Sequence, residues 1–485
     1  MGYAIDLFID GKRVAGEGET EFICRNPATG GEIGRFREAS PAQIEAAIES
    51  ATRAQKEWAA MPAEERGRIL RKAANLLRAR NDELARIEVA DTGKPITEAL
   101  AVDVQTGADA IEHYANLAGS IAGEYQDFGY GFYYTRREPI GVCAGLGAWN
   151  YPLQIACWKS APALAAGNAM IFKPSELTPI NAVNLAEIYC EAGMPAGVFN
   201  VLQGERNPGA ALAAHPAIEK VSLTGSAPTG RKVMEAASPR LKEVSLELGG
   251  KSPLIIFEDA DPEHAARLAM YANFLTQGEI CANGTRVFIH SSIYDAVLEE
   301  IVKRTATLKV GAPDNPDTQI GALISEDHLG VVAGFVDRAR EAGANIVCGG
   351  SRVEVPGHNK GAFFAPTVIA DSTDDMEHVR EEIFGPVMSV LKFETEDEVV
   401  ARANQSDYGL AGGVVTKDLV RAHRVAANIQ TGMFWINTYQ AQPMQIPFGG
   451  YKQSGIGREN GWDVLDEYTQ KKSVFVQMKP EDLPF

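Results

Sequence analysis

The chain has 485 residues, 45% of them hydrophobic, which is enough for large cores and two or three domains. Its 64 acidic and 46 basic side chains give a formal net charge of -18 without any basic run, so a nucleic-acid partner is not expected. The six cysteines are scattered and form no C-x-x-C pair, which favours reduced thiols. Because no apolar run approaches membrane-spanning length and the N-terminus lacks a signal-peptide layout, we expect a cytoplasmic protein without a membrane partner.

The first strong pattern along the chain is a helical one, over residues 40–61. Short apolar runs then alternate with helix-like stretches, and these runs occupy residues 141–149, 169–172, 198–204, 220–225 and 252–257. This alternation predicts an α/β protein with mainly parallel sheets. A glycine pair in LELGGKSP (246–253) marks a seam, after which a second α/β series runs to about residue 450.

A strand-to-helix turn in SLTGSAPTGRKVMEAAS (222–238) is a candidate phosphate site. Gly225 and Gly230 flank Pro228, which suits the first turn of a helix. Backbone N–H groups at such a turn can face a pyrophosphate. The G-x-x-x-x-G spacing matches neither the dinucleotide fingerprint nor a P-loop, so a plain tight turn is the alternative.

The run IFKPSE (171–176) gives a second nucleotide signal. It places Lys173 and Glu176 at the end of a strand, on the carboxyl edge of the predicted sheet. A carboxylate there can bind ribose hydroxyls and repel a 2′-phosphate, which predicts a preference for NAD over NADP. The alternative is a solvated strand end.

Cys281, in GEICANGTRV (278–287), could be a buried filler, a metal ligand or a nucleophile. No His or Cys lies near it at metal-ligand spacing, which disfavours zinc, and no papain-type signature surrounds it. A lone cysteine is more often buried and inert. The neighbourhood of Cys281 alone leaves filler and nucleophile open.

Several motifs together point to one family. They are GAWNYP (147–152), FKPSE (172–176), LTGS (223–226), LELGGKSP (246–253), GEICANGTRV (278–287), EEIFGPV (381–387) and PFGGYKQSGIGRENG (447–461). Their order resembles that of the aldehyde dehydrogenase superfamily over nearly the whole chain. Within it, the run from Asn150 to Glu176 and the NGTRVFIH after Cys281 look most like betaine aldehyde dehydrogenases. Enzymes acting on aminoaldehydes or 4-trimethylaminobutyraldehyde are the nearest alternatives.

The resemblance implies an aldehyde dehydrogenase-like fold with three parts. A Rossmann-type NAD domain would comprise residues 1–119 and 139–247, and an α/β catalytic domain residues 248–465. Residues 120–138 and 466–485 would form a small β oligomerisation domain. The alternating aromatics of residues 123–139 suit a strand that pairs outside its own core, and we expect a homo-oligomer, either a dimer or a tetramer.

The resemblance also implies NAD-dependent oxidation of an aldehyde to a carboxylate, through a thiohemiacetal and a thioester. Cys281 would be the nucleophile, and the Asn150 amide and the Cys281 N–H would be the oxyanion donors. Glu247 would be the base for hydrolysis, with Lys159 and Glu459 as a proton relay. The presence of Cys281, Asn150 and Glu247 disfavours a catalytically silent structural homologue, and Glu247 favours water over coenzyme A as the acyl acceptor.

The implied cofactor is NAD, with NADP as the alternative. Glu382 would bind the nicotinamide ribose and Phe384 would lie beside the ring. The full implied cofactor set is Gly147, Ala148, Trp149, Lys173, Pro174, Ser175, Glu176, Gly225, Ser226, Ala227, Pro228, Gly249, Glu382 and Phe384. Betaine-type members also hold monovalent cations such as K+, for which we nominate the Asp91 side chain and the Lys452 carbonyl.

For the substrate, the resemblance places Tyr151, Trp158 and Tyr439 around the aldehyde tunnel. A quaternary ammonium cannot donate hydrogen bonds, so aromatic faces and nearby negative charge must select it. Asp103 aligns with acidic residues that assist cation binding in some relatives; a surface helix carboxylate is the alternative. Many betaine aldehyde dehydrogenases have Trp where this chain has the smaller Tyr439, which leaves room for a longer substrate. We expect betaine aldehyde, oxidised to glycine betaine, ahead of 4-trimethylaminobutyraldehyde.

Overall fold

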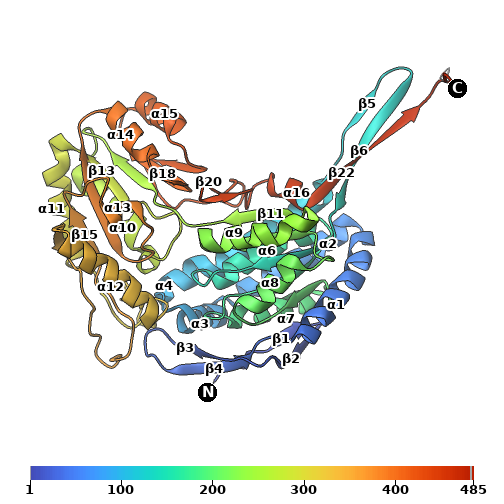
Figure 1. Cartoon of the computed structure of the whole chain (residues 1–485), viewed down its shortest axis with the longest axis horizontal. Coiled ribbons are helices and arrows are strands. Elements are labelled where there is room, and N and C mark those ends of the chain that lie inside the picture. Colours follow the sequence, from blue (N-terminus) through green and yellow to red (C-terminus); the bar gives the residue numbers. More distant parts are fainter. Residues whose placement is uncertain (1, 481–482) are drawn as a thin grey trace.

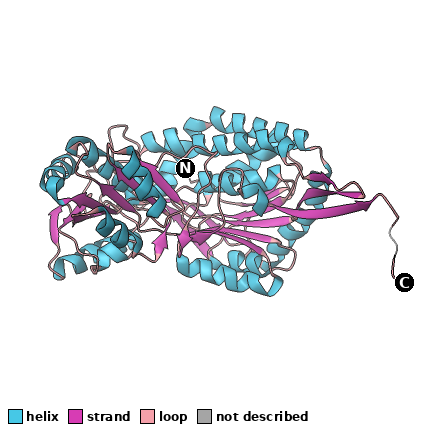
Figure 2. Ribbon diagram, turned by 90° about the horizontal axis from the view of Figure 1, so that it is seen from above, coloured by secondary structure: helices cyan, strands magenta, loops and turns pink. Residues whose placement is uncertain are grey.

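In the computed structural model, residues 2–480 and 483–485 are described, and they form two sheet-centred bodies with a narrow projecting sheet (Figure 1). Seen from above, the strands run through the middle and helices lie on either side of them (Figure 2). The predicted α/β class with mainly parallel sheets is confirmed. Within the described ranges, none of the helices combines the length and the apolar character needed to cross a bilayer.

The first sheet carries much of the predicted nucleotide site. Its strands, in spatial order, are β2 (Lys12–Val14), β1 (Leu7–Ile9), β9 (Phe199–Val201), β8 (Ala169–Lys173), β7 (Val142–Leu146), β10 (Lys220–Thr224), β11 (Glu243–Glu247) and β21 (Gly455–Ile456). The run from β9 to β11 is parallel, and its apolar sequences are typical of strands covered on both faces. β21 is antiparallel to β11. β21, which lies near the C-terminus, is therefore the edge strand of this sheet, next to β11, whose last residue is Glu247.

Helices cover both faces of this sheet. One face packs on α2 (Ala63–Ala79), α5 (Val104–Leu117), α6 (Pro152–Ala165) and α7 (Ile180–Ala192), and the other on α1 (Pro41–Ala60), α8 (Arg206–Ala214) and α9 (Ala227–Ala237). Successive residues of β7 alternate between these cores, since Cys143 joins the first and Val142 and Ala144 the second. The predicted helix over residues 40–61 is confirmed as α1, which begins at a capping box formed by Ser40 and Gln43.

Shorter elements precede and follow α2. The hairpin of β3 (Glu21–Arg25) and β4 (Glu32–Arg37) lies near the N-terminus. After α2, the chain forms α3 (Asn81–Thr92), α4 (Ile96–Glu98) and a π-helical turn (Ala99–Asp103) that leads into α5. These elements bury Glu88, Lys94 and Asp103, and Glu88 accepts a hydrogen bond from the Leu153 N–H at the start of α6.

The second sheet follows the predicted seam, because the chain crosses from β11 to β12 through residues 248–252. Its strands, in spatial order, are β14 (Asn345–Cys348), β15 (Thr367–Ala370), β16 (Val387–Phe393), β13 (Arg286–His290), β12 (Pro253–Ile256), β18 (Ala411–Val415) and β19 (Met433–Ile436). All its pairs are parallel except β14 with β15. Its covering helices are α10 (Pro262–Phe274) and α11 (Tyr294–Thr305) on one face, α13 (Glu377–Arg380), α14 (Glu396–Asn404) and α15 (Leu419–Asn428) on the other, and α12 (Glu326–Glu341) at one end.

A three-stranded sheet of β22 (Thr469–Gln477), β6 (Gly131–Pro139) and β5 (Tyr125–Asp127) projects away from the body (Figure 1). It is antiparallel and leaves Tyr125, Tyr130 and Phe475 more than half exposed. Exposed aromatics on a projecting sheet are typical of a surface that another chain covers. The domain boundaries and the oligomerisation role stay predictions.

Candidate active site

A cavity of about 510 Å³ lies at the carboxyl ends of the first sheet's strands. Ligands of open α/β sheets bind outside this edge. One end of the cavity reaches Glu247 and Cys281, and Glu382 and Phe384 of the second body close it. The cavity therefore joins the predicted nucleotide residues to the predicted chemical residues.

Cys281 lies in a strained loop before β13. Thr276 and Gln277, five and four residues ahead of it, have positive φ angles of 50° and 43°, which non-glycine residues adopt at a cost. A Cβ on Gly250 would lie 2.8 Å from the Cys281 carbonyl oxygen, so the absence of a side chain there lets the two segments touch. The packing fixes the position of the half-buried Cys281 thiol.

The environment of the Cys281 thiol keeps it protonated in the free protein. Burial is the main cause that raises its pKa above the ordinary range of a thiol, and the negative charges of Glu382 and Glu247 add to the shift. Backbone N–H groups of Cys281 and Ala282 act in the opposite direction. Forming the thiolate therefore requires a nearby proton acceptor or added positive charge.

Asn150 lies on the turn between β7 and α6, and its side chain reaches the cysteine loop. Its Nδ2 donates a 3.0 Å hydrogen bond to the carbonyl of Glu279, two residues before Cys281. A primary amide has a second N–H, which is the group that an oxyanion could use. The structure thus brings Asn150 to the cysteine loop, and its oxyanion role stays a prediction.

Glu247 is the last residue of β11 and is almost completely buried. Among the residues described, none forms a hydrogen bond with either of its carboxylate oxygens. Burial raises the pKa of Glu247 well above its usual range and the charge of Glu459 adds to this, while Lys159 and Arg458 oppose it. A carboxyl group with a raised pKa is suited to proton transfer nearer to neutral pH.

The two predicted relay residues form a buried ion pair. Lys159 on α6 pairs with Glu459, and its Nζ also donates to Ser222 Oγ at 2.9 Å. Ser222 in turn lies 3.4 Å from Glu459 Oε1. The sequence did not indicate Ser222 as a site residue, because a serine inside a strand carries no local signal of such a contact.

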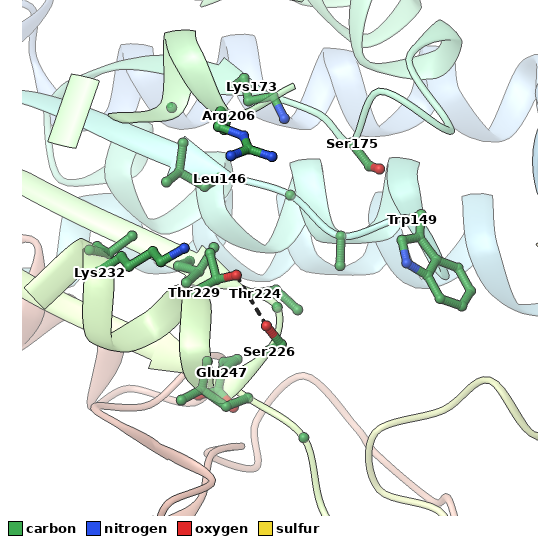
Figure 3. Close-up of a pocket in the computed structure, with 18 of the residues that line it drawn as sticks. Leu146, Trp149, Lys173, Ser175, Arg206, Thr224, Ser226, Thr229, Lys232 and Glu247 are labelled. Atoms are coloured by element: carbon green, nitrogen blue, oxygen red, sulfur yellow. Dashed lines mark hydrogen bonds between the residues drawn. The ribbon is translucent and has the colours of Figure 1, made fainter. Parts of the chain in front are cut away.

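The phosphate end of the cavity is built by the first turn of α9. Ser226 bonds to Thr229 at 3.1 Å, and no side chain in the described part of the chain caps the helix (Figure 3). Its first N–H groups therefore remain for an anion, as at other helix N-termini. Pro228 occupies the first turn as predicted. Arg206 and Lys232, two cations that the motifs did not indicate, lie at this end, away from Trp149 (Figure 3).

Lys173 and Glu176 meet at the edge of β8, with 3.5 Å between Lys173 Nζ and Glu176 Oε2. Both line the cavity. Burial lowers the pKa of Lys173, and the neighbouring carboxylate opposes that change. Of the predicted cofactor residues, only Pro174, Ala227 and Pro228 are outside the cavity lining that the structure describes.

At the other end, Glu382 Oε1 accepts a 3.0 Å hydrogen bond from the Gly250 N–H. A Cβ on Gly249 would overlap Glu382 Oε2. Burial raises the pKa of Glu382 to about 7. Phe384 lies edge-on to Trp149, with ring centroids 5.1 Å apart. The residues at this end therefore combine a carboxylate with two aromatic walls.

His328 on α12 completes the aromatic wall, and sequence reasoning missed it. Its ring centroid is 5.3 Å from that of Trp149, and its Nε2 lies 2.7 Å from the Phe384 carbonyl oxygen. The burial of His328 lowers its pKa, which favours a neutral ring that donates this bond from Nε2. No motif surrounds this histidine in the sequence.

Two of the three predicted aromatic substrate residues contact the cysteine loop. The Tyr151 hydroxyl lies 2.6 Å from Thr276 Oγ1. Tyr439 is buried, packs on Trp435 at 4.5 Å and donates from its hydroxyl to the Ala282 carbonyl at 3.0 Å. Trp158 lies edge-on to Phe448, with ring centroids 6.0 Å apart, and belongs to the same hydrophobic cluster as Ala282. None of the three is among the described residues that line the 510 Å³ cavity, and their substrate role stays a prediction.

The remaining candidates lie away from the cavity. Asp103 is completely buried in an ion pair with Lys94, so the alternative of a surface helix carboxylate is wrong. Asp91 accepts hydrogen bonds from Cys24 Sγ at 3.0 Å and from the Ile180 N–H at 3.3 Å. Lys452 lies at the surface, where its Nζ donates to the Asn404 and Ser406 carbonyls.

Within residues 2–480 and 483–485, no group of three or more His, Cys, Asp or Glu side chains is placed to hold a metal ion. A monovalent cation is held mostly by backbone carbonyls, so its site needs no such group, and the K+ sites stay predictions.

The chain belongs to the aldehyde dehydrogenase family, since the model of the "Aldehyde dehydrogenase family" matches residues 14–474. It is 55% identical over 479 residues to a betaine aldehyde dehydrogenase of Vibrio vulnificus (strain CMCP6), with 99% of each chain covered. An aldehyde dehydrogenase from Bacillus cereus, solved as its NAD+ complex, superposes with a TM-score of 0.96 at 40% identity, covering 98% of this chain and 97% of the other. Betaine aldehyde dehydrogenase from Staphylococcus aureus, also solved with NAD+, gives 0.96 at 37% identity, covering 99% and 98%. The predicted resemblance and fold are confirmed.

The substitution Gly249→Ala is expected to weaken NAD binding by about tenfold or more, because the new methyl group overlaps Glu382 and forces it to move. Titration of the protein with NAD, followed by calorimetry, measures this. Gly330→Ala on α12 is the matched control, since its Cβ would meet open space. An unchanged NAD affinity in Gly249→Ala would contradict the assigned geometry.

The substitution Glu247→Gln is expected to lower steady-state turnover by on the order of 10²–10⁴-fold, since it removes the predicted base for hydrolysis. Rapid mixing should still give an initial burst of NADH. In the unmodified enzyme, turnover should fall as pH decreases through the raised pKa of Glu247, because only the ionised carboxylate accepts a proton. That dependence should disappear in Glu247→Gln. Glu243→Gln, exposed on the same strand, is the control, and loss of the burst would show that Glu247 acts earlier.

Proposed function

We propose that this chain oxidises betaine aldehyde to glycine betaine with NAD, using Cys281 as the nucleophile. The observation that carries the proposal is the meeting of Cys281, Asn150 and Glu247 at one end of the nucleotide-sized cavity. The 55% identity to a betaine aldehyde dehydrogenase over the whole chain supports the choice of aldehyde.

The first half of the reaction takes place on the cysteine. The Cys281 thiol loses its proton to solvent, and the resulting thiolate adds to the aldehyde carbon and turns the carbonyl oxygen into an alkoxide of a thiohemiacetal. The second N–H of the Asn150 amide and the backbone N–H of Cys281 donate to that oxygen. In other enzymes, one such donor stabilises the transition state by about 2.7–4 kcal/mol. NAD, when bound, accepts the hydride that leaves this carbon. The carbonyl re-forms as a thioester on Cys281.

Water completes the reaction. Glu247 takes a proton from water as the water oxygen attacks the thioester carbon, and the carbon–sulfur bond then breaks. The remaining acid proton passes to the departing sulfur, so that the carboxylate and the Cys281 thiol are released. The buried position of Glu247, without a hydrogen-bond partner among the described residues, leaves its oxygens available for water. The Lys159–Glu459 pair with Ser222 offers a route that could return the proton toward solvent.

The cavity fits NAD. The uncapped first turn of α9 suits a pyrophosphate, Glu176 suits ribose hydroxyls, and Glu382 and Phe384 suit the nicotinamide ribose and ring. Related solved structures at 37–40% identity were obtained with NAD+. Because Lys173 is already paired with Glu176, we propose NAD in preference to NADP.

Aromatic side chains support a trimethylammonium substrate. Tyr151 and Tyr439 contact the cysteine loop, and Trp158 belongs to the same hydrophobic cluster as Ala282. Aromatic faces are the groups that bind a cation without hydrogen-bond donors. The smaller ring of Tyr439 keeps 4-trimethylaminobutyraldehyde as the second candidate.

We also propose a homo-oligomer that forms through the projecting sheet. Its exposed aromatics, among them Tyr125, Tyr130 and Phe475, favour burial against a second copy, as a dimer or within a tetramer. We further propose a cytoplasmic location and a bound K+.

Cys281→Ala is expected to abolish aldehyde oxidation while NAD binding remains measurable, because the nucleophile is lost and the cavity wall is kept. Formation of NADH from betaine aldehyde and calorimetric NAD binding are the two measurements. Cys348→Ala, on the distant strand β14, is the control and should retain activity. Substantial turnover in Cys281→Ala would show that another group attacks the aldehyde.

The substrate is tested by comparing betaine aldehyde with 3,3-dimethylbutanal, its uncharged analogue of the same shape. We expect a higher kcat/KM for betaine aldehyde, and 4-trimethylaminobutyraldehyde serves as the third arm. Trp158→Ala should reduce the preference for the charged aldehyde on the order of tenfold, because it removes one aromatic face. Equal kcat/KM for the charged and uncharged aldehydes in the unmodified enzyme would overturn the substrate and leave the aldehyde dehydrogenase chemistry.

A further inference from the structure

The most unusual charge near the active site is a buried lysine that binds an aromatic ring. Lys94 is completely buried, and its Nζ lies 3.6 Å from the centroid of the Tyr151 ring. It is also ion-paired with Asp103, which is equally buried. Tyr151 itself is only partly buried. One face of its ring is therefore occupied by an ammonium, and the rest of the residue keeps some exposure.

Local backbone features bring these groups together. Gly93 adopts a left-handed conformation with φ 79° and ends α3, which turns Lys94 inward. The π-helical turn Ala99–Asp103 places Asp103 on the buried side before α5 begins. The position of Lys94 is thus determined by the fold and does not depend on a flexible surface side chain.

Other carboxyl groups surround this pair. Glu88 is buried and Glu98 is half-buried, and loss of solvent raises the pKa of Glu88 to about 8 and that of Glu98 to about 7, while Lys94 opposes both shifts. Thr276 donates to Glu98 Oε2 from its N–H at 2.9 Å and from its hydroxyl at 2.8 Å. The Tyr151 hydroxyl lies 2.6 Å from the same Thr276 hydroxyl. Tyr151 is therefore connected to the strained loop that carries Cys281.

We propose that Lys94 is a specificity-determining residue, whose ammonium on one face of Tyr151 weakens the attraction of that ring for a cationic substrate. The proposal rests on the proposed function, because it concerns how the same site treats a trimethylammonium aldehyde. The attraction of a ring for a cation comes from the negative potential of its faces. An ammonium already bound to one face reduces that potential, and its charge repels a second cation near the ring.

Asp103 limits this effect but does not cancel it. The ion pair is neutral as a whole, and the Asp103 and Glu98 carboxylates also act on Tyr151, since burial raises the pKa of its hydroxyl and both carboxylates add to that shift. The ammonium nevertheless lies on a face of the ring, 3.6 Å from its centroid, and the ring faces are the part of the residue that attracts a cation. Lys94 would in this way moderate the binding of betaine aldehyde and of its zwitterionic product, which carries the same ammonium group.

The test is the ratio of kcat/KM for betaine aldehyde to kcat/KM for 3,3-dimethylbutanal. Lys94→Met keeps the length of the side chain and removes the charge, and Lys94→Met combined with Asp103→Asn removes both charges and leaves no uncompensated carboxylate. We expect the ratio to rise on the order of tenfold in both. Asp103→Asn alone keeps the ammonium and should leave the ratio at or below that of the unmodified enzyme. Lys303→Met, at an exposed position of α11, is the control.

A purely structural role would reduce both activities together. An unchanged ratio in either Lys94 variant would therefore overturn the proposal, and so would an equal rise in Asp103→Asn. If Lys94→Met does not fold, the double variant alone tests the proposal. If the double variant does not fold either, Asp103→Asn tests it: a raised ratio overturns the proposal, and a lowered ratio supports it. Failure of the proposed substrate is seen separately, in the unmodified enzyme, as equal kcat/KM for the two aldehydes.

Discussion

The active site depends on a close approach of three backbone segments, which only glycine permits. Side chains on Gly249, Gly250 and Gly278 would overlap or crowd Glu382, the Cys281 carbonyl and the backbone of Gly385 respectively. The segment after β11, the cysteine loop and the segment after α13 therefore meet without intervening side chains. This contact places a residue of the first sheet, Glu247, beside residues that belong to the second, and the cavity between them becomes a single site.

Burial is the second constraint, and it disfavours negative charge in the site. The pKa values of Cys281, Glu247 and Glu382 are all raised, chiefly by loss of solvent, and the charges of Glu382 and Glu247 raise the pKa of Cys281 further. Such groups titrate as a set. A negative charge on the sulfur and one on Glu247 therefore oppose each other. When the sulfur is bound in a thioester, it carries no negative charge and does not oppose ionisation of Glu247.

The sequence predicted the strands, the seam and most of the cavity wall, because these depend on local patterns. Apolar runs such as residues 169–172 and 252–257 have the length of a strand and are bounded by polar, glycine or proline residues. The glycine pair at 249–250 marks the change from the first sheet to the second. The residues that it missed reach the site through tertiary contacts. His328 lies on α12 and Ser222 lies inside a strand. Neither residue has sequence neighbours that form a motif, so the sequence did not indicate its position at the site. The surface alternative for Asp103 failed for the same reason, since its partner Lys94 is nine residues away and a π-helical turn determines its direction.

Two buried ion pairs act on residues of the candidate active site, one on Tyr151 and one on Glu247. In each pair a lysine from the first body is completely buried and paired with a carboxylate, Lys94 with Asp103 and Lys159 with Glu459. Such pairs contribute little to stability after desolvation, but they hold a charge at a defined point. Besides burial, Glu459 raises the pKa of Glu247, while Lys159 opposes the shift. The Lys94 ammonium lies 3.6 Å from the Tyr151 ring centroid, while Asp103 adds to the rise that burial causes in the pKa of the Tyr151 hydroxyl. The two members of a neutral pair therefore act differently on the same neighbour, so each pair influences that neighbour although its net charge is zero.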